Sequence, residues 1–131
     1  MTAPAIELVD PGSLRHIEGF SARRVEWLEQ KIVREGLWIK PIAIDQEHAL
    51  VLDGQHRMEV SRRLGLRAIP AVRYPYAEVE VWSLRPKSHT FTWETVVERA
   101  LAGDIYPYKT VKHRFPQDVP ACAFPLEELR S

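Results

Sequence analysis

The chain has 131 residues, of which 45% are hydrophobic, which is enough for one compact domain and excludes disorder as its general state. Its 18 basic side chains balance 18 acidic ones, so it lacks the broad positive charge of a dedicated DNA-binding protein. The single cysteine, Cys122, excludes an internal disulfide and a cysteine-rich metal site.

The first 45 residues predict two short strands with a helix between them. Residues 6–9 predict a strand, which the segment Asp10-Pro11-Gly12-Ser13 ends. Ser21 is typical of a helix N-cap, apolar residues recur after it at helical spacing, and Gly36 ends this helix. Residues 41–45 then predict the second strand.

The middle of the chain predicts a hairpin, a helix and a further strand. Residues 49–52 form an apolar run that pairs with the preceding strand across a short turn. A short helix follows the loop at residues 53–57. Residues 69–74 predict another strand.

The C-terminal part begins with a strand at residues 78–82, where polar and apolar side chains alternate. A helix with an apolar stripe follows, capped by Thr92 or Thr90. Residues 106–115 form a basic, proline-interrupted tail, and we expect residues 116–131 to be a surface extension.

The N-terminal segment MTAPAIELVDPGS has neither a basic region nor an apolar run, so we expect no signal peptide. No apolar run approaches the roughly 20 residues that span a bilayer. A lone cysteine suits a reducing compartment. These features predict a cytoplasmic protein without a membrane partner.

The loop Asp53-Gly54-Gln55-His56-Arg57 carries the strongest chemical signal. It joins an apolar strand to a helix, and a helix N-terminus presents free N–H groups that favour an anion. Gly54 allows a sharp turn close to a ligand, and Arg57 can clamp a phosphate with two hydrogen bonds. The loop predicts a phosphate site; the alternative is a turn capped by Asp53 with two solvated basic side chains.

Three other segments give this loop a context. Lys40-Pro41-Ile42-Ala43-Ile44-Asp45 precedes it, and Leu64-Gly65 and Ile69-Pro70-Ala71-Val72 follow it. Together with the loop they resemble the ParB/sulfiredoxin N-terminal-like domain. The resemblance implies an α+β fold, a small mixed sheet with packed helices, in a single domain over residues 1–131 with its core at about 6–115.

Two branches of that superfamily do not fit the sequence. Sulfiredoxins carry a catalytic cysteine in the loop, where this chain has Gln55, and Cys122 lies far away. Partition-type ParB proteins continue into a helix-turn-helix region, of which we find no sign. DNA is therefore not the expected partner.

A third branch, the free L-serine kinases, is similar over more of the chain. Their Asp-Gly-His-His-Arg loop matches residues 53–57 except at Gln55, and their later Pro-Lys-Thr-Thr-Arg-His segment is similar to residues 107–113 except at Val111 and Lys112. The resemblance implies a small-molecule kinase that moves phosphate from ATP or ADP to the hydroxyl of free L-serine or a related amino acid, with Mg²⁺.

The same resemblance implies roles for individual residues. Glu18, in the linker before the first helix, matches the general base, with a surface glutamate as the alternative. The nucleotide is expected at Lys40, Pro41, Asp53, Gly54, Gln55, His56 and Arg57, with Mg²⁺ at Asp53. The amino acid is expected at Trp82, Lys109, Thr110, His113 and Arg114.

Several alternatives stay open at this point. Trp82 fits a core position as well as a pocket wall, the basic tail fits a solvated surface, and either Lys112 or Arg114 reaches phosphate. His16 is expected at the surface or in a cap. A non-catalytic ParB-like module that binds nucleotide, or DNA through a partner, is the alternative function.

Overall fold

The computed structural model describes residues 4–130. Residues 1–3, part of the segment behind the expectation of no signal peptide, and Ser131 lie outside the described residues. The central sheet has the strand order β1-β5-β3-β4, where β1 is Glu7–Val9, β3 is Ile42–Asp45, β4 is Val51–Asp53 and β5 is Ile69–Tyr74. β3 and β5 run parallel, and the other two pairs are antiparallel, which confirms a small mixed sheet.

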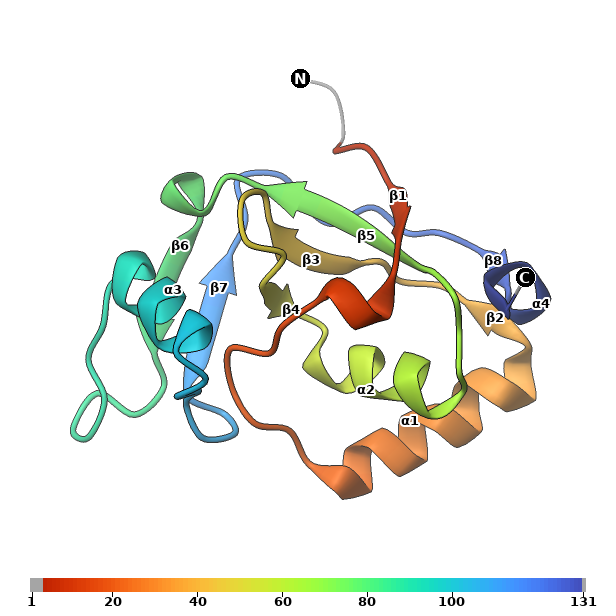
Figure 1. Ribbon diagram of the computed structural model, residues 1–131, viewed down its shortest axis with the longest axis horizontal. Helices are drawn as coiled ribbons and strands as arrows, with labels where there is room; N and C mark the ends of the chain where they lie inside the picture. The colour runs from red at the N-terminus through yellow and green to blue at the C-terminus, as the bar shows by residue number, and fades with distance from the viewer. Residues whose placement is uncertain (1–3, 131) are drawn as a thin grey trace.

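The helices pack around this sheet, as Figure 1 shows. They are α1 (Ala22–Glu35), α2 (Gln55–Arg63), α3 (Trp93–Leu101) and α4 (Leu126–Arg130), with short 3-10 turns η1 (Pro11–Ser13) and η2 (Tyr76–Glu78). α1 and α2 lie side by side on one side of the sheet, and α3 lies beside the two-stranded sheet of β6 (Glu80–Ser83) and β7 (Val111–Arg114). The α+β class is therefore confirmed.

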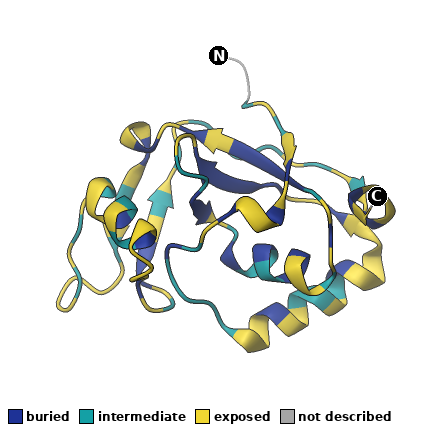
Figure 2. Ribbon diagram, in the orientation of Figure 1, coloured by how far each residue is buried: buried dark blue, intermediate teal, exposed yellow. Residues whose placement is uncertain are grey.

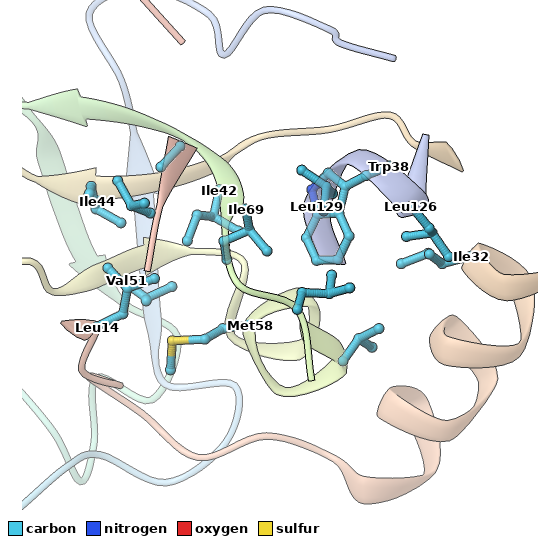
Figure 3. Close-up of a cluster of buried hydrophobic side chains, with 14 of the residues drawn as sticks. Leu14, Ile32, Trp38, Ile42, Ile44, Val51, Met58, Ile69, Leu126 and Leu129 are labelled. Atoms are coloured by element: carbon cyan, nitrogen blue, oxygen red, sulfur yellow. The ribbon is translucent and has the colours of Figure 1, made fainter. Parts of the chain in front are cut away.

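Both faces of the central sheet are covered, which explains its uninterrupted apolar strands. Ile42 and Ile44 belong to one buried cluster, drawn in Figure 3, while Ala43 between them belongs to a second cluster on the opposite face. Figure 2 shows the resulting contrast between the buried central strands and the exposed outer side of α1. Alternate side chains of one strand thus supply two separate cores.

The ends of α1 follow the expected capping chemistry. The Ser21 hydroxyl accepts a hydrogen bond from the Arg24 N–H at 3.3 Å, and Gly36 closes the helix with φ of 68°, a left-handed conformation that suits glycine. Thr92 caps α3 through a reciprocal pair of hydrogen bonds with Thr95. Thr92, not Thr90, is therefore the cap.

The segment expected to be a surface extension instead contributes to the core. Leu126 and Leu129 are buried in the first cluster, and β8 (Phe124–Pro125) pairs with β2 (Leu37–Trp38). The Arg67 N–H donates to the Leu129 carbonyl at 2.8 Å. Two leucines among polar and proline residues give no local periodic signal, because their apolar partners lie far away in the sequence.

The basic tail is also more ordered than its composition predicts. Its residues Val111–Arg114 form β7 and pair antiparallel with β6, so that Trp82 lies opposite Lys112 and Glu80 opposite Arg114. Within residues 4–130, we find no helix with the length and apolar character needed to cross a membrane.

Candidate functional site

A cavity of about 620 Å³ opens where α1, α2 and β7 approach one another, a volume that suits a small-molecule site. Figure 1 shows the start of α2 between β7 and α1. The cavity is lined by nine of the residues expected at the site: Glu18, Lys40, Asp53, Gly54, Gln55, His56, Arg57, Lys109 and His113. Side chains from distant parts of the sequence thus meet around one space.

Four expected residues do not line it. Pro41 is buried, and Trp82 is 43% exposed on β6. Arg114 is exposed at the end of β7. The buried Thr110 hydroxyl donates to the Pro107 carbonyl at 2.6 Å and so is not free to bind an amino acid. Of the two cations left open, Lys112 lines the cavity and Arg114 does not.

The N-terminus of α2 opens into the cavity at Gly54. Gly54 has φ of 117° and no side chain to cap the helix, so the first N–H groups of α2 are left for a ligand. A Cβ atom at this position would lie 2.5 Å from Cγ2 of Ile42. Only glycine therefore lets β4 pass directly into α2 at this place.

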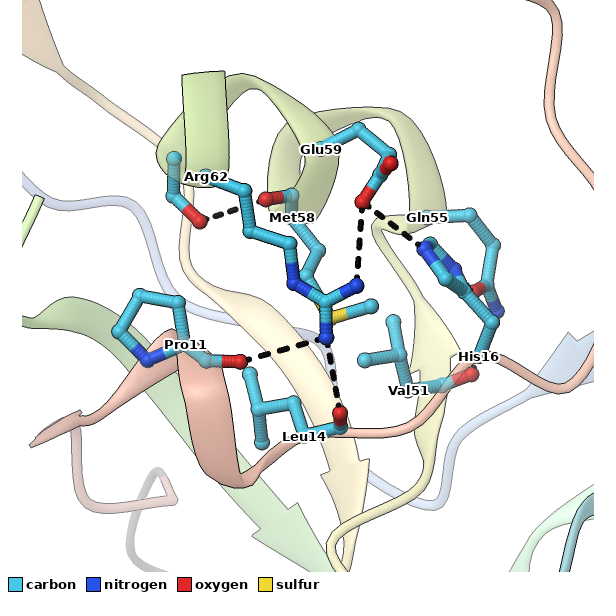
Figure 4. A network of polar contacts seen from close by, with 9 residues as sticks. Pro11, Leu14, His16, Val51, Gln55, Met58, Glu59 and Arg62 are labelled. Carbon is cyan, nitrogen blue, oxygen red and sulfur yellow. Dashed lines mark hydrogen bonds and ion pairs between the residues drawn. The ribbon is translucent and has the colours of Figure 1, made fainter. Parts of the chain in front are cut away.

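The buried Gln55 side chain is hydrogen-bonded within the protein. Its amide nitrogen donates to the Val51 carbonyl at 2.5 Å, and its amide oxygen lies 2.5 Å from Nδ1 of His16 (Figure 4). Nε2 of His16 lies 3.2 Å from a carboxylate oxygen of Glu59. Gln55 therefore offers a ligand only its main chain, and His16 is a part-buried bridge rather than the expected surface or capping histidine.

Arg57 is largely committed to the protein itself. One guanidinium nitrogen donates to the carbonyls of Lys40 and Pro41, each at 3.1 Å, and the other lies 3.7 Å from the Asp53 carboxylate. Burial lowers the pKa of Arg57, and the charge of Asp53 opposes that shift. Arg57 thus links Lys40 and Pro41, which precede β3, to Asp53 at the end of β4. It also adds positive charge to the cavity lining.

His56 is arranged as a neutral hydrogen-bond donor. Its Nε2 accepts the Ser21 N–H at 3.1 Å, which assigns the proton of the neutral ring to Nδ1. Burial is the main cause that lowers the His56 pKa, and the charge of Arg24 is the next. The neutral ring is consequently favoured, with Nδ1–H free to donate.

Glu18 is held by the backbone at the other side of the cavity. One carboxylate oxygen accepts the N–H groups of Thr110 at 2.9 Å and Val111 at 3.0 Å. Burial raises the Glu18 pKa, while the two N–H groups and the charge of Arg85 lower it. A positioned carboxylate with a raised pKa is suited to general-base chemistry.

His113 does not provide the positive charge expected of a carboxylate clamp. Its Nε2 lies 2.7 Å from the Tyr76 hydroxyl, and burial lowers the His113 pKa to about 4. The ring is therefore neutral near pH 7. Lys109 and Lys112 supply the charge on this side of the cavity.

One face of α1 supplies lining residues that were not expected. Arg24, Lys31 and Glu35 all line the cavity, beside the apolar Leu28. Their spacing of three and four residues places them on one helix face. That spacing was visible in the sequence, but the cavity it faces was not.

A divalent cation would have few protein ligands here. Among residues 4–130 there is no group of three or more His, Cys, Asp or Glu side chains that could hold a metal ion. Asp53 lines the cavity with a side chain that is 49% exposed. A single carboxylate of this kind fits Mg²⁺, which is usually bound by one or two carboxylates plus substrate phosphates.

The fold that holds this site also occurs in solved structures of other proteins. Among solved structures, a free serine kinase in complex with AMP is similar, with a TM-score of 0.86 and 14% identity over 98% of this chain and 95% of that chain. A conserved hypothetical protein from Pyrococcus furiosus has a TM-score of 0.85 and 14% identity over 98% of both chains.

A third structure, SbnI with a C-terminal truncation from Staphylococcus aureus, has a TM-score of 0.84 and 11% identity over 95% of this chain and 89% of that chain. At these identities the likeness shows the fold. No protein-family model matches the sequence, and no curated protein matches it either.

Proposed function

We propose that this protein is a small-molecule kinase, carried by one domain over residues 1–131. It transfers the terminal phosphate of ATP or ADP to the hydroxyl of free L-serine or a related amino acid, with Glu18 as general base. The observation that carries the proposal is the meeting, in one cavity, of a backbone-held carboxylate and the uncapped N-terminus of α2.

The charge of the cavity supports a ligand with several negative groups. Six Lys and Arg side chains line it against three Asp and Glu side chains, although the whole chain is neutral. The basic residues are Arg24, Lys31, Lys40, Arg57, Lys109 and Lys112. An excess of positive charge within a cavity concentrates phosphates and carboxylates there.

Each part of the transfer has a candidate group. The free N–H groups of α2, Nδ1–H of His56 and the Lys40 ammonium hold the phosphates, since such transfers depend mainly on positioning and charge neutralisation. Mg²⁺, held through Asp53 and phosphate oxygens, would supply further neutralisation. Lys109 and Lys112 hold the carboxylate of the acceptor.

The chemical step then moves one proton and one phosphoryl group. The acceptor oxygen forms a bond to the terminal phosphorus, while the bond from that phosphorus to the leaving oxygen of ADP or AMP breaks. The hydroxyl proton passes to the Glu18 carboxylate as the new bond forms.

Structures of similar fold support the nucleotide part of the proposal. A free serine kinase has been solved with AMP, and a variant of it, with a glutamate replaced by alanine, has been solved with ADP. The fold is therefore compatible with an adenine nucleotide in those proteins.

A turnover assay with purified protein tests the proposal. Mg-ATP or Mg-ADP is supplied with L-serine, L-threonine or L-homoserine, and phosphoamino acid is measured. We expect Glu18→Gln to lower kcat by about 10²- to 10⁴-fold, the usual contribution of a general base. Glu26→Gln, at an exposed position of α1, is the matched control and retains wild-type activity.

Two negative outcomes of the turnover assay would each decide between the candidate functions. If no acceptor is phosphorylated with either nucleotide, the kinase proposal is wrong. Nucleotide binding without turnover, together with DNA binding that weakens steeply with salt, would instead identify the non-catalytic module.

A further inference from the structure

The turn at residues 107–110 leads into the two N–H groups that bind the Glu18 carboxylate. Lys109 has φ of 59°, an unusual conformation for a residue with a side chain, and the Thr110 hydroxyl bonds back to the Pro107 carbonyl at 2.6 Å. This geometry directs the N–H groups of Thr110 and Val111 toward the same Glu18 oxygen. Whatever holds the turn therefore holds the carboxylate.

Arg85 stabilises this turn through hydrogen bonds to its backbone. This arginine lies outside the sequence motifs described above. Its Nη2 donates to the Tyr108 carbonyl at 2.7 Å, and its Nε donates to the Lys109 carbonyl at 3.4 Å. The backbone next to it also contacts the turn, since the Leu84 N–H donates to the Thr110 carbonyl at 2.8 Å. The guanidinium thus contacts the Lys109 carbonyl, which shares a peptide group with the Thr110 N–H bound to Glu18, and the Tyr108 carbonyl one residue earlier.

The arginine is itself anchored. Its own N–H donates to the Ser83 hydroxyl at 3.0 Å, and its carbonyl accepts the N–H groups of Ser88 at 3.1 Å and His89 at 2.8 Å. A fixed backbone and a planar fork reduce the conformational freedom that a single surface cation would lose on binding.

We propose that Arg85 is a positioning residue, which holds the 107–110 turn so that Glu18 is oriented toward the cavity. This inference rests on the proposed function for its catalytic meaning. The claim that Arg85 controls the orientation and the pKa of Glu18 can be tested without any measurement of turnover.

The same turn also reaches the phosphate side of the cavity. The Tyr108 ring meets the His56 ring edge to face, with centroids 5.4 Å apart. Arg85, through the Tyr108 carbonyl, therefore constrains the distance between the acceptor side and the donor side. Displacing the turn alters the alignment of the two reactants, and a misplacement of about 1 Å can cost about 100-fold in rate.

Other charged groups face Glu18 as well. Asp53 raises the Glu18 pKa, and Arg85 lowers it. Lys109 and Lys112 line the same cavity, and burial raises the pKa of the Tyr76 phenol, which keeps that phenol uncharged. Loss of the positive charge at Arg85 leaves Asp53 less opposed, so the Glu18 pKa rises.

Two substitutions separate the charge of Arg85 from its geometry. Arg85→Gln removes the charge and the fork. Arg85→Lys keeps the charge, but a single ammonium cannot reproduce the planar arrangement of donors. Lys87→Gln is the matched control, because it removes one positive charge from the same exposed linker and Lys87 does not line the cavity.

The experiment measures the Glu18 carboxyl titration by carbon-13 NMR, the pH profile of kcat, and KM for the nucleotide. We expect Arg85→Gln to raise the Glu18 pKa, to move the acid limb of kcat to higher pH, and to lower kcat about 10- to 100-fold with nucleotide KM unchanged. Arg85→Lys keeps the acid limb and lowers kcat. Lys87→Gln matches wild type in all three readouts.

The inference is overturned if Arg85→Gln, shown to be folded by circular dichroism, titrates like wild type at Glu18. If Arg85→Gln does not fold, an Arg85→Lys variant with unchanged kcat overturns it. A wild-type protein without turnover defeats the kinase proposal, while the NMR titration still decides whether Arg85 governs Glu18.

Discussion

Gly54 occupies a position that no other residue fits, and Gly54→Ala measures how much the fold depends on it. Its φ of 117° costs a residue with a side chain about 1–3 kcal/mol. The added Cβ would also lie 2.5 Å from Cγ2 and 2.9 Å from Cβ of Ile42, a steric conflict of a kind that costs about 1–3 kcal/mol. We therefore expect a loss of roughly 2–6 kcal/mol, a large part of the total stability of about 5–15 kcal/mol that is typical of a domain.

Gly36→Ala is the matched control for this measurement. Gly36 also has a positive φ, of 68°, but an added Cβ would meet nothing within 4 Å. Gly36→Ala therefore loses only the stability that a left-handed backbone costs an alanine, about 1–2 kcal/mol. Urea unfolding followed by circular dichroism gives both values, and calorimetric titration with ADP shows whether the start of α2 still binds nucleotide. Equal losses in the two variants would refute the close approach of Gly54 to Ile42.

Two further predictions concern stability. Leu129→Ala should cost about 2–5 kcal/mol in urea unfolding because its side chain is fully buried, whereas Leu101→Ala, 45% exposed, should stay within about 0.5 kcal/mol; equal effects would contradict a core role for the C-terminal segment. The His113 pKa of about 4 lies below its ordinary 6.5, so the unfolded chain binds more protons between these values and stability falls as the pH drops through them. His113→Gln should flatten that dependence when urea midpoints are compared between pH 7 and pH 4, and an unaltered slope would show that His113 is not responsible.

Local chemistry explains why much of the fold was predictable. Ser21 and Gly36 mark the ends of α1 because a hydroxyl cap and a left-handed glycine each solve a backbone problem within a few residues. The passage from an apolar strand through Gly54 to a helix was predictable for the same reason. The predicted loop at residues 53–57 is shorter in the structure, because Asp53 ends β4 and Gln55 already begins α2.

The orientation of individual polar side chains was not predictable from the sequence. Gln55 and Thr110 were expected to contact ligands, but each finds a partner within the protein: the former at Val51 and His16, the latter at Pro107. Composition identifies a polar side chain and not the direction in which it points. Residues far from the motifs, such as Arg85, become relevant only once the fold brings their loops together.

The location of Leu129 has a consequence for the synthesis of this chain. It completes a cluster that also contains Val9 and Trp38, so residues from both ends of the described chain share one core. Contacts between such distant residues form slowly, because a long loop must close before they stabilise the structure. On the ribosome, the apolar surface around Trp38 lacks the cover of Leu129 until residue 129 has emerged, and transiently exposed apolar surface of this kind favours aggregation.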